Sequence, residues 1–391
     1  MDFKQNYIPL SIPYLNGKEK EYTLKCFKDN WLSSAGPYID KFEKSFAEYL
    51  GVKFAVACSS GTASLHLALK ALNIKAGDLI IAPNLTFIAT VNVIKYVNAE
   101  PILIDADINT WQINIECLNN FLSKKCITKK KRCYHKKSGK RISALIITHI
   151  LGYSSDIHAI KQLAKKYFLL VIEDAAEALG SKFNRKKLGT FGDIGCFSFN
   201  GNKLITTGSG GMLVTNSKKY ASVAKHLAQQ AKIRNNNYIH TEVGYNYRMS
   251  NIQASIGLAQ LQDVNYRLQR KKEIHLYYKK NLSEFKEISF PIEIRKSESS
   301  YWLNTIRILK NRNNVDVNCI KNNLKKNQIE TRSLWQPMNT SSPHQNSIYV
   351  GMENAKNLYA SCISLPSSVG LSYEQQDRVI KEITKMIKDK D

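Results

Sequence analysis

The chain has 391 residues, of which 43% are hydrophobic and 23% charged, with a formal net charge of +25. This length and composition are typical of a globular protein with one large core and a smaller second domain. The longest apolar stretch, ALIITHILG, is far too short to cross a bilayer, and the first residues lack the pattern of a secretory signal. We therefore expect a cytoplasmic protein without a membrane partner.

Short apolar runs alternate with helical patterns through the first two-thirds of the chain. Helical patterns cover residues 61–72, 86–97 and 156–168. Runs of four to eight apolar residues between helices are typical of buried strands in a mostly parallel sheet, which predicts an α/β domain. The runs are FAVACSS (54–60), LIIAP (79–83), EPILIDAD (100–107), ISALIITHI (142–150), LLVIEDAA (169–176), IGCFSFN (194–200) and GGMLVTNS (210–217).

The densest basic run covers residues 123–141 and has the composition of a loop. Clustered Lys and Arg attract phosphate, but no nucleic-acid-binding motif accompanies the charge. We expect a lysine-rich solvated surface and no nucleic-acid partner, although the charge could draw in a small anion such as a nucleotide diphosphate. Cys126, Cys133 and His135 lie in this run, but their spacing matches no common zinc pattern, so we expect no metal site.

A long helical stretch begins near Ser250, and the pattern after it is mixed and less regular. We expect a large α/β domain over residues 1–262 and a smaller C-terminal α+β domain over residues 263–391. An amphipathic helix over residues 372–390 would end the second domain.

Polar residues follow several predicted strands, where α/β sheets place their ligand sites. Ser60, Gly61 and Thr62 open a helix, an arrangement that binds phosphate but is equally typical of a simple helix cap. Asp174 ends a strand, where a carboxylate needs a cationic partner unless it caps a helix. Lys203 follows another strand and precedes several glycines. An amine, a buried carboxylate and a phosphate cradle are together what pyridoxal phosphate requires.

Six spaced motifs carry a resemblance to a known family. Together they resemble the DegT/StrS-type sugar aminotransferases, pyridoxal phosphate enzymes of fold type I, with the closest likeness to the legionaminic-acid and bacillosamine type of nucleotide-sugar 4-aminotransferase. The motifs are SSGTASLHLAL, PNLTFIATVNVI, EPILIDADINTW, VIEDAAEALGS, GTFGDIGCFSFNGNKLITTGSGG and GYNYRMSNIQASIGLAQL.

The resemblance implies a role for each matching residue. Lys203 would form the Schiff base with the cofactor and move the proton, and Asp174 would pair with the pyridine nitrogen. Phe87 would stack on the ring, unless it is a plain core residue. Asn246 would reach the phosphate of the other subunit, which implies a homodimer with its active site at the interface. The expected phosphate contacts are Gly61, Thr62 and Ser198.

Other positions are less settled by the resemblance. Glu177 stands where many relatives carry Gln or His, which by the resemblance would place it near the phenolic oxygen of the cofactor. Ser209 stands in a GSGG stretch where GEGG is commoner. Arg248 would meet an anionic group, with a surface ion pair as the alternative. A substrate-facing loop is expected at Trp31, Ser33 and Ser34. Trp335 is a further candidate, with core packing as its alternative.

The family likeness implies a transamination in two halves. L-glutamate would leave its amino group on the cofactor as pyridoxamine phosphate, and a nucleotide-linked 4-keto-6-deoxy sugar, expected to be of the UDP-4-keto-6-deoxy-GlcNAc type, would receive it for glycan biosynthesis. The alternatives are a 3-keto sugar or a GDP- or dTDP-linked one. A non-catalytic binding protein on the same fold is the hypothesis from another class.

Overall fold

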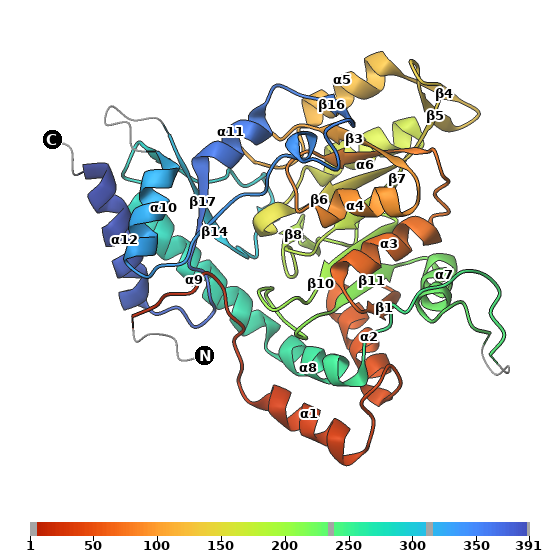
Figure 1. Cartoon of the computed structure of the whole chain (residues 1–391), viewed down its shortest axis with the longest axis horizontal. Helices are drawn as coiled ribbons and strands as arrows, with labels where there is room; N and C mark the ends of the chain where they lie inside the picture. The colour runs from red at the N-terminus through yellow and green to blue at the C-terminus, as the bar shows by residue number, and fades with distance from the viewer. Residues whose placement is uncertain (1–5, 234–237, 310–315, 389–391) are drawn as a thin grey trace.

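The computed structural model describes residues 6–233, 238–309 and 316–388. A large sheet with its helices forms one body, and α9, α10, α12, β14 and β17 form a smaller one beside it (Figure 1). The expected architecture, a large mostly parallel α/β part with a smaller α+β part, is confirmed.

The large sheet contains all seven predicted strands. Its main path runs in the order β1-β11-β10-β7-β6-β2-β3-β16. β11 is antiparallel to both of its neighbours, and the other pairs along the path are parallel. The strands are β1 (Phe54–Cys58), β2 (Leu79–Pro83), β3 (Glu100–Ile104), β6 (Arg141–Thr148), β7 (Leu170–Asp174), β10 (Ile194–Ser198), β11 (Gly211–Thr215) and β16 (Ile348–Val350).

Helices cover both faces of this sheet because side chains alternate across each strand. In β2, Leu79 and Ile81 enter one core cluster, whereas Ile80 and Ala82 enter the other. The first cluster packs under α2 (Pro37–Leu50), α5 (Ile115–Lys125), α6 (Ile157–Tyr167) and α8 (Asn251–Gln262). The second packs under α3 (Gly61–Ala71), α4 (Ala89–Tyr96) and α7 (Lys218–Ala228).

The basic run at 123–141 is not a loop, so that prediction was wrong. It contains a hairpin of β4 (Cys126–Lys129) and β5 (Arg132–His135), which adds to β6. Lys130 and Lys131 form its two-residue turn with φ of 48° and 57°, as a type I′ turn requires. Lysines at turn positions usually filled by Asn-Gly hid the hairpin from sequence patterns.

The smaller body is built on an antiparallel sheet in the order β12-β14-β17-β15. Its core draws residues from three helices and from Ile8 near the start of the chain. The strands are β12 (Ile288–Ser289), β14 (Asn304–Ile308), β15 (Arg332–Ser333) and β17 (Cys362–Leu365), and the helices are α9 (Val264–Leu282), α10 (Val317–Lys326) and α12 (Tyr373–Lys388).

The expected domain boundary falls at Asp263, between the end of α8 and the start of α9. The division into two domains there stays a prediction. The predicted C-terminal helix is confirmed as α12 up to Lys388, and residues 389–390 lie outside the described part of the chain. The remaining elements are α1 (Lys18–Lys28), η1 (Ile150–Gly152), β8 (Lys182–Phe183), β9 (Lys186–Lys187), β13 (Ser297–Glu298), η2 (Met338–Thr340) and α11 (Asn354–Ser361).

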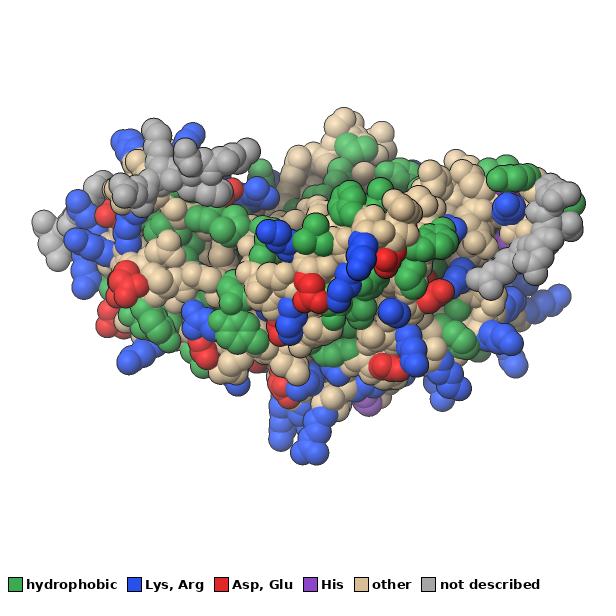
Figure 2. All heavy atoms as spheres, turned by 90° about the horizontal axis from the view of Figure 1, so that it is seen from below, with side chains coloured by type: hydrophobic (Ala, Val, Ile, Leu, Met, Phe, Trp, Pro, Cys, Tyr) green, Lys and Arg blue, Asp and Glu red, His purple; other side chains and the backbone are tan. Residues whose placement is uncertain are grey.

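Lys and Arg side chains are spread across the face seen in Figure 2, with acidic and hydrophobic side chains among them. Within the described ranges, no helix has both the length and the apolar character needed to cross a membrane. Nor do three His, Cys, Asp or Glu side chains of the described residues gather as a metal site would require. The cytoplasmic location stays a prediction.

Candidate active site

A cavity of about 410 Å³ lies at the carboxyl ends of strands β6, β7 and β10. Parallel strands end at the same edge of a sheet, which is why residues far apart in sequence meet there. Of the eight residues predicted to bind the cofactor, seven line the cavity: Gly61, Thr62, Phe87, Asp174, Glu177, Ser198 and Lys203. The smaller body supplies its opposite wall: Trp302, Leu303, Arg332, Ser333, Leu334, Trp335 and Ser364.

One end of the cavity is formed by the N-terminus of α3. Ser60 caps this helix, because its hydroxyl accepts a hydrogen bond of 3.0 Å from Ala63 N. Gly61 and Thr62 follow on the cavity wall. A Cβ atom on Gly61 would lie 2.8 Å from the Ser198 Cβ, so only glycine allows this close approach. The helix cap is therefore confirmed, and phosphate binding at the same helix N-terminus stays a prediction.

Asp174 ends β7 and is 5% exposed. Its carboxylate accepts hydrogen bonds from Thr90 Oγ1 at 2.6 Å and from Ala176 N at 3.2 Å. Burial raises the pKa of Asp174, and the hydrogen bonds from Thr90 and Ala176 oppose that rise. A turn rather than a helix follows Asp174, so the helix-cap alternative was wrong. A cation facing this wall would be bound strongly.

Glu173 and His149 support the same edge of the sheet and were missed from the sequence. Ser155 N donates to His149 Nδ1, so the Nε2–H of His149 donates to Glu173 at 3.0 Å. Burial alone would raise the pKa of Glu173, but hydrogen bonds from His149 and the amides of Gly192 and Gly189 outweigh it and lower that pKa. Glu173 thereby fixes the loop beside Asp174.

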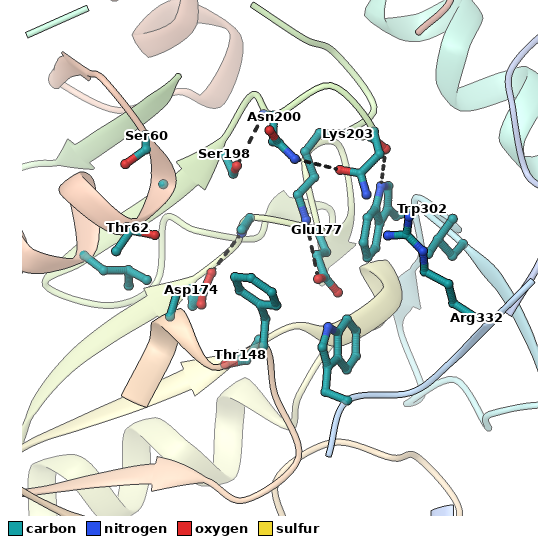
Figure 3. Close-up of a pocket in the computed structure, with 18 of the residues that line it drawn as sticks. Ser60, Thr62, Thr148, Asp174, Glu177, Ser198, Asn200, Lys203, Trp302 and Arg332 are labelled. Carbon is teal, nitrogen blue, oxygen red and sulfur yellow. Dashed lines mark hydrogen bonds and ion pairs between the residues drawn. The ribbon is translucent and has the colours of Figure 1, made fainter. Parts of the chain in front are cut away.

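Lys203 lies in the turn after β10, and its side chain points toward Glu177 (Figure 3). Lys203 Nζ is 3.5 Å from Glu177 Oε1, and the other carboxylate oxygen accepts a 2.8 Å hydrogen bond from Leu151 N. Burial raises the pKa of Glu177, and the charge of Lys203 opposes the rise. Trp302 also faces the amine, with 3.8 Å between Lys203 Nζ and the ring centroid. Lys203 therefore belongs to an enclosed site, unlike most lysines of this chain.

Two aromatic side chains that had core packing as an alternative line this cavity. Phe87 is 53% exposed, so it is not a plain core residue. Trp335 lies on the opposite wall, from the smaller body. Ser209 also reaches the cavity, and its hydroxyl donates to Ser59 O at 3.0 Å. The serine thus ties the glycine stretch to the turn before α3.

The expected partner-facing and substrate-loop residues lie outside this cavity, and their roles stay predictions. Asn246 is exposed, in a segment held beside β1 by a hydrogen bond from Ser59 N to Tyr247 O. Trp31 and Arg248 line a separate hollow of about 390 Å³. The acidic residues of this hollow, Asp40 and Glu43, form ion pairs with Lys225, and no described acidic residue pairs with Arg248.

The loop that carries Trp31, Ser33 and Ser34 is anchored by a buried amide. Asn251 Nδ2 donates to Trp31 O at 2.8 Å, and Asn251 N donates to Ser33 O at 2.7 Å. Tyr38 N donates to Asn251 Oδ1 at 2.9 Å. One side chain therefore fixes both ends of the loop to the start of α8.

Arg332 and Trp302 are cavity residues that sequence patterns did not reveal. Arg332 is largely exposed, and its Nη2 is 3.6 Å from Glu330 Oε1. Both residues come from the smaller body, whose irregular pattern gave no strand-end signal. A single Trp or Arg in such a segment has no regular spacing to other polar residues that would mark it as part of a site.

The cavity residues fit pyridoxal phosphate. A glycine without room for a Cβ lies at the helix N-terminus, where a phosphate would bind. A buried carboxylate, Asp174, would hold the pyridine nitrogen in its protonated form, and the Lys203 amine lies within the same cavity.

The chain is similar to known proteins over nearly its whole length. It is 42% identical over 384 residues to a GDP-perosamine synthase of Escherichia coli O157:H7, covering 98% of this chain and 100% of the relative. It is 37% identical to the putative pyridoxal phosphate-dependent aminotransferase EpsN of Bacillus subtilis, covering 96% and 94% of the two chains. The solved structure of the aminotransferase TlmJ from Streptoalloteichus hindustanus aligns with a TM-score of 0.87 at 26% identity, covering 97% and 98% of the two chains.

The model of the DegT/DnrJ/EryC1/StrS aminotransferase family matches residues 13–384, nearly the whole chain. The expected fold type, enzyme class and cofactor, pyridoxal phosphate, are thereby confirmed. The chain belongs to the DegT/DnrJ/EryC1/StrS aminotransferase family.

Proposed function

We propose that this aminotransferase moves the amino group of L-glutamate to a keto sugar linked to a nucleoside diphosphate. The observation that carries the proposal is the meeting of Lys203, Asp174 and the α3 N-terminus in one cavity. When bound, pyridoxal phosphate supplies an electron sink that makes the proton on the amine-bearing carbon removable.

The side chains of the cavity have separate roles in proton transfer and in binding the cofactor. The Lys203 amine would accept the proton from the amine-bearing carbon of the substrate and would deliver it to C4′ of the cofactor. Asp174 would hold the pyridine nitrogen in its protonated form through its carboxylate. Gly61, Thr62 and Ser198 would hold the phosphate, and Phe87 would stack on the ring.

Arg332 supports an amino acid, such as L-glutamate, as the amino donor. Besides Lys203 it is the only Lys or Arg that lines the cavity among the described residues. A guanidinium binds a carboxylate through two parallel hydrogen bonds, which fixes orientation as well as charge. We assign Arg332 to a carboxylate of L-glutamate, which leaves Lys203 free for the proton.

A GDP-linked 4-keto-6-deoxy sugar is the proposed acceptor. The full-length likeness to a GDP-perosamine synthase supports GDP over the UDP-linked N-acetyl sugar that the sequence motifs favoured. The net charge of +25 favours any such anionic substrate, because a basic surface raises its local concentration. The UDP-linked sugar stays a prediction.

A panel of sugars tests the proposal. The protein is loaded with pyridoxamine phosphate and mixed with GDP-, UDP- or dTDP-linked 4-keto and 3-keto sugars, and the absorbance of the lysine-bound cofactor is followed. Its return with the GDP-linked 4-keto sugar supports the proposal. Return only with another sugar moves the assignment to that sugar, and no return with any sugar, despite a normal reaction with glutamate, overturns it.

A further inference from the structure

The indole of Trp302 lies against the amine of Lys203. Lys203 Nζ is 3.8 Å from the ring centroid, and Figure 3 shows Trp302 beside the Lys203 side chain. Trp302 is only 4% exposed, so the contact is largely withdrawn from water. An aromatic face attracts a cation more strongly when both are desolvated. The amine is therefore held between one indole and one carboxylate, that of Glu177.

Three hydrogen bonds fix Trp302, each to a different segment. Its Nε1–H donates to Asn202 O at 2.7 Å, and its backbone N–H donates to Leu151 O at 3.1 Å. Its carbonyl accepts a hydrogen bond of 2.7 Å from Lys271 Nζ. Asn202 directly precedes Lys203, so Trp302 holds the backbone at the base of the lysine and also faces its amine.

Leu151 connects Trp302 to the second neighbour of the amine. The carbonyl of Leu151 accepts from Trp302, and its N–H donates to Glu177 Oε2 at 2.8 Å. The indole and the carboxylate beside Lys203 are thus placed by the same short turn, η1. A shift of Trp302 would move this turn and, with it, Glu177.

Lys271 holds Trp302 from behind. It is 2% exposed, and its amine donates to the carbonyls of Trp302 and Ser367 rather than to a carboxylate. Burying an amine is costly, and an apolar side chain in its place would avoid that cost. A lysine at position 271 is therefore better explained by its hydrogen bond to the Trp302 carbonyl than by a gain in folding stability.

We infer that Trp302 is a positioning residue that holds the Lys203 amine at its reacting place, and that Lys271 holds Trp302. The inference rests on the proposed role of Lys203. The indole limits the rotamers of the lysine, so its Nζ stays on the cavity side. Without the indole, the four-carbon stem of Lys203 would sample positions away from the cofactor.

The test measures how fast Lys203 attaches to the cofactor, independently of turnover. Pyridoxal phosphate is added to the cofactor-free chain, borohydride traps the bond at timed intervals, and mass spectrometry quantifies the modified Lys203 peptide. We expect the rate to fall about tenfold in Trp302→Leu, less in Trp302→Phe, and in the same direction in Lys271→Met. Phe121→Leu, which removes a buried ring of 3% exposure in a different core cluster, serves as control and should keep the wild-type rate.

A second measurement separates positioning from collapse of the cavity. Non-covalent affinity for pyridoxal phosphate is compared between Lys203→Ala and the double variant Lys203→Ala/Trp302→Leu. Equal affinities within about threefold support positioning, and a larger loss overturns it in favour of a structural role. A wild-type attachment rate in Trp302→Leu also overturns the inference. If the wild-type chain is modified at other lysines and not at Lys203, the assignment of Lys203 itself fails.

Discussion

Thr90 in α4 donates a 2.6 Å hydrogen bond from its hydroxyl to the carboxylate of Asp174, at the end of β7. The two residues are 84 positions apart in the chain and are brought together by the packing of α4 on the sheet. Burial raises the pKa of Asp174, and this bond is the largest of the effects that oppose the rise. The charge of Asp174 therefore depends on a residue of α4 that does not itself line the cavity.

Replacing Thr90 with Val removes this bond with little change in shape. The pKa of Asp174 should rise further, because burial is then less opposed. We expect affinity for pyridoxal phosphate and kcat each to fall about tenfold, since hydrogen bonds to charged groups contribute about 1.5–3 kcal/mol. Thr215→Val, the same change at a buried strand position outside the cavity, is the control. Unchanged cofactor affinity in Thr90→Val would falsify this role.

Replacing Lys203 with Ala should abolish turnover and the absorbance of the lysine-bound cofactor, because no other described lysine lines the cavity. The loss of the cation beside Glu177 also leaves that carboxylate buried without it, so the pKa of Glu177 should rise. Absorbance spectra and glutamate turnover check the first result. Lys219→Ala, at an exposed helix position, should behave as wild type. Retained activity in Lys203→Ala contradicts the assignment.

Mixing two inactive variants tests whether Asn246 acts on the partner subunit. Consider a dimer of one Lys203→Ala chain and one Asn246→Ala chain. If Asn246 acts on the partner subunit, one of the two active sites has neither substitution and the other has both. We expect equal mixtures, exchanged under mild denaturant, to recover about a quarter of wild-type activity. If Asn246 acts within its own chain, every hybrid site carries one change and the mixture stays as inactive as its components.

The sequence predicts the site residues at strand ends and misses those that only tertiary packing brings to the site. Asp174 and Ser198 end buried parallel strands, and such ends meet by geometry, so both were found. Thr90 is an ordinary helix residue whose partner only the packing supplies. Trp302 and Arg332 come from the smaller body, where no periodic pattern marks a site. The β4–β5 hairpin was missed because lysines occupy both positions of its turn.

Gly36 lies in the loop that carries Trp31, in a backbone conformation that favours glycine. Its φ is 144°, and an added Cβ would lie 2.3 Å from the Asn251 Cγ. Gly36→Ala should lower the free energy of unfolding by about 1–3 kcal/mol and displace the loop, because Asn251 also holds Trp31 O. Urea unfolding measures the loss.

A control glycine separates the clash from the strain. Gly17 has a φ of 99° and no neighbouring atom within 4 Å of an added Cβ. Gly17→Ala should therefore cost only the backbone strain and less than Gly36→Ala. Equal losses in the two variants would mean that the contact with Asn251 does not matter.

Lys271 should make the free energy of unfolding rise with pH. Burial lowers the pKa of Lys271 to about 7, whereas an unfolded lysine titrates near 10.4. Between these two values the unfolded chain binds the proton and the folded chain does not, so the free energy of unfolding rises with pH. Below about pH 7 both states are protonated, and this contribution no longer changes. His275, one turn along α9, has its pKa lowered to about 4 by burial and stays neutral throughout this range.

The difference in unfolding free energy between wild type and Lys271→Met isolates this contribution. It should shift in favour of the wild type by on the order of 2 kcal/mol between about pH 7.5 and 9, at a slope of up to about 1.4 kcal/mol per pH unit. Urea titrations of both chains at each pH measure it. A difference that is flat across this interval would show that Lys271 keeps its proton in the folded chain, and that its carbonyl partners stabilise the ammonium as well as water does.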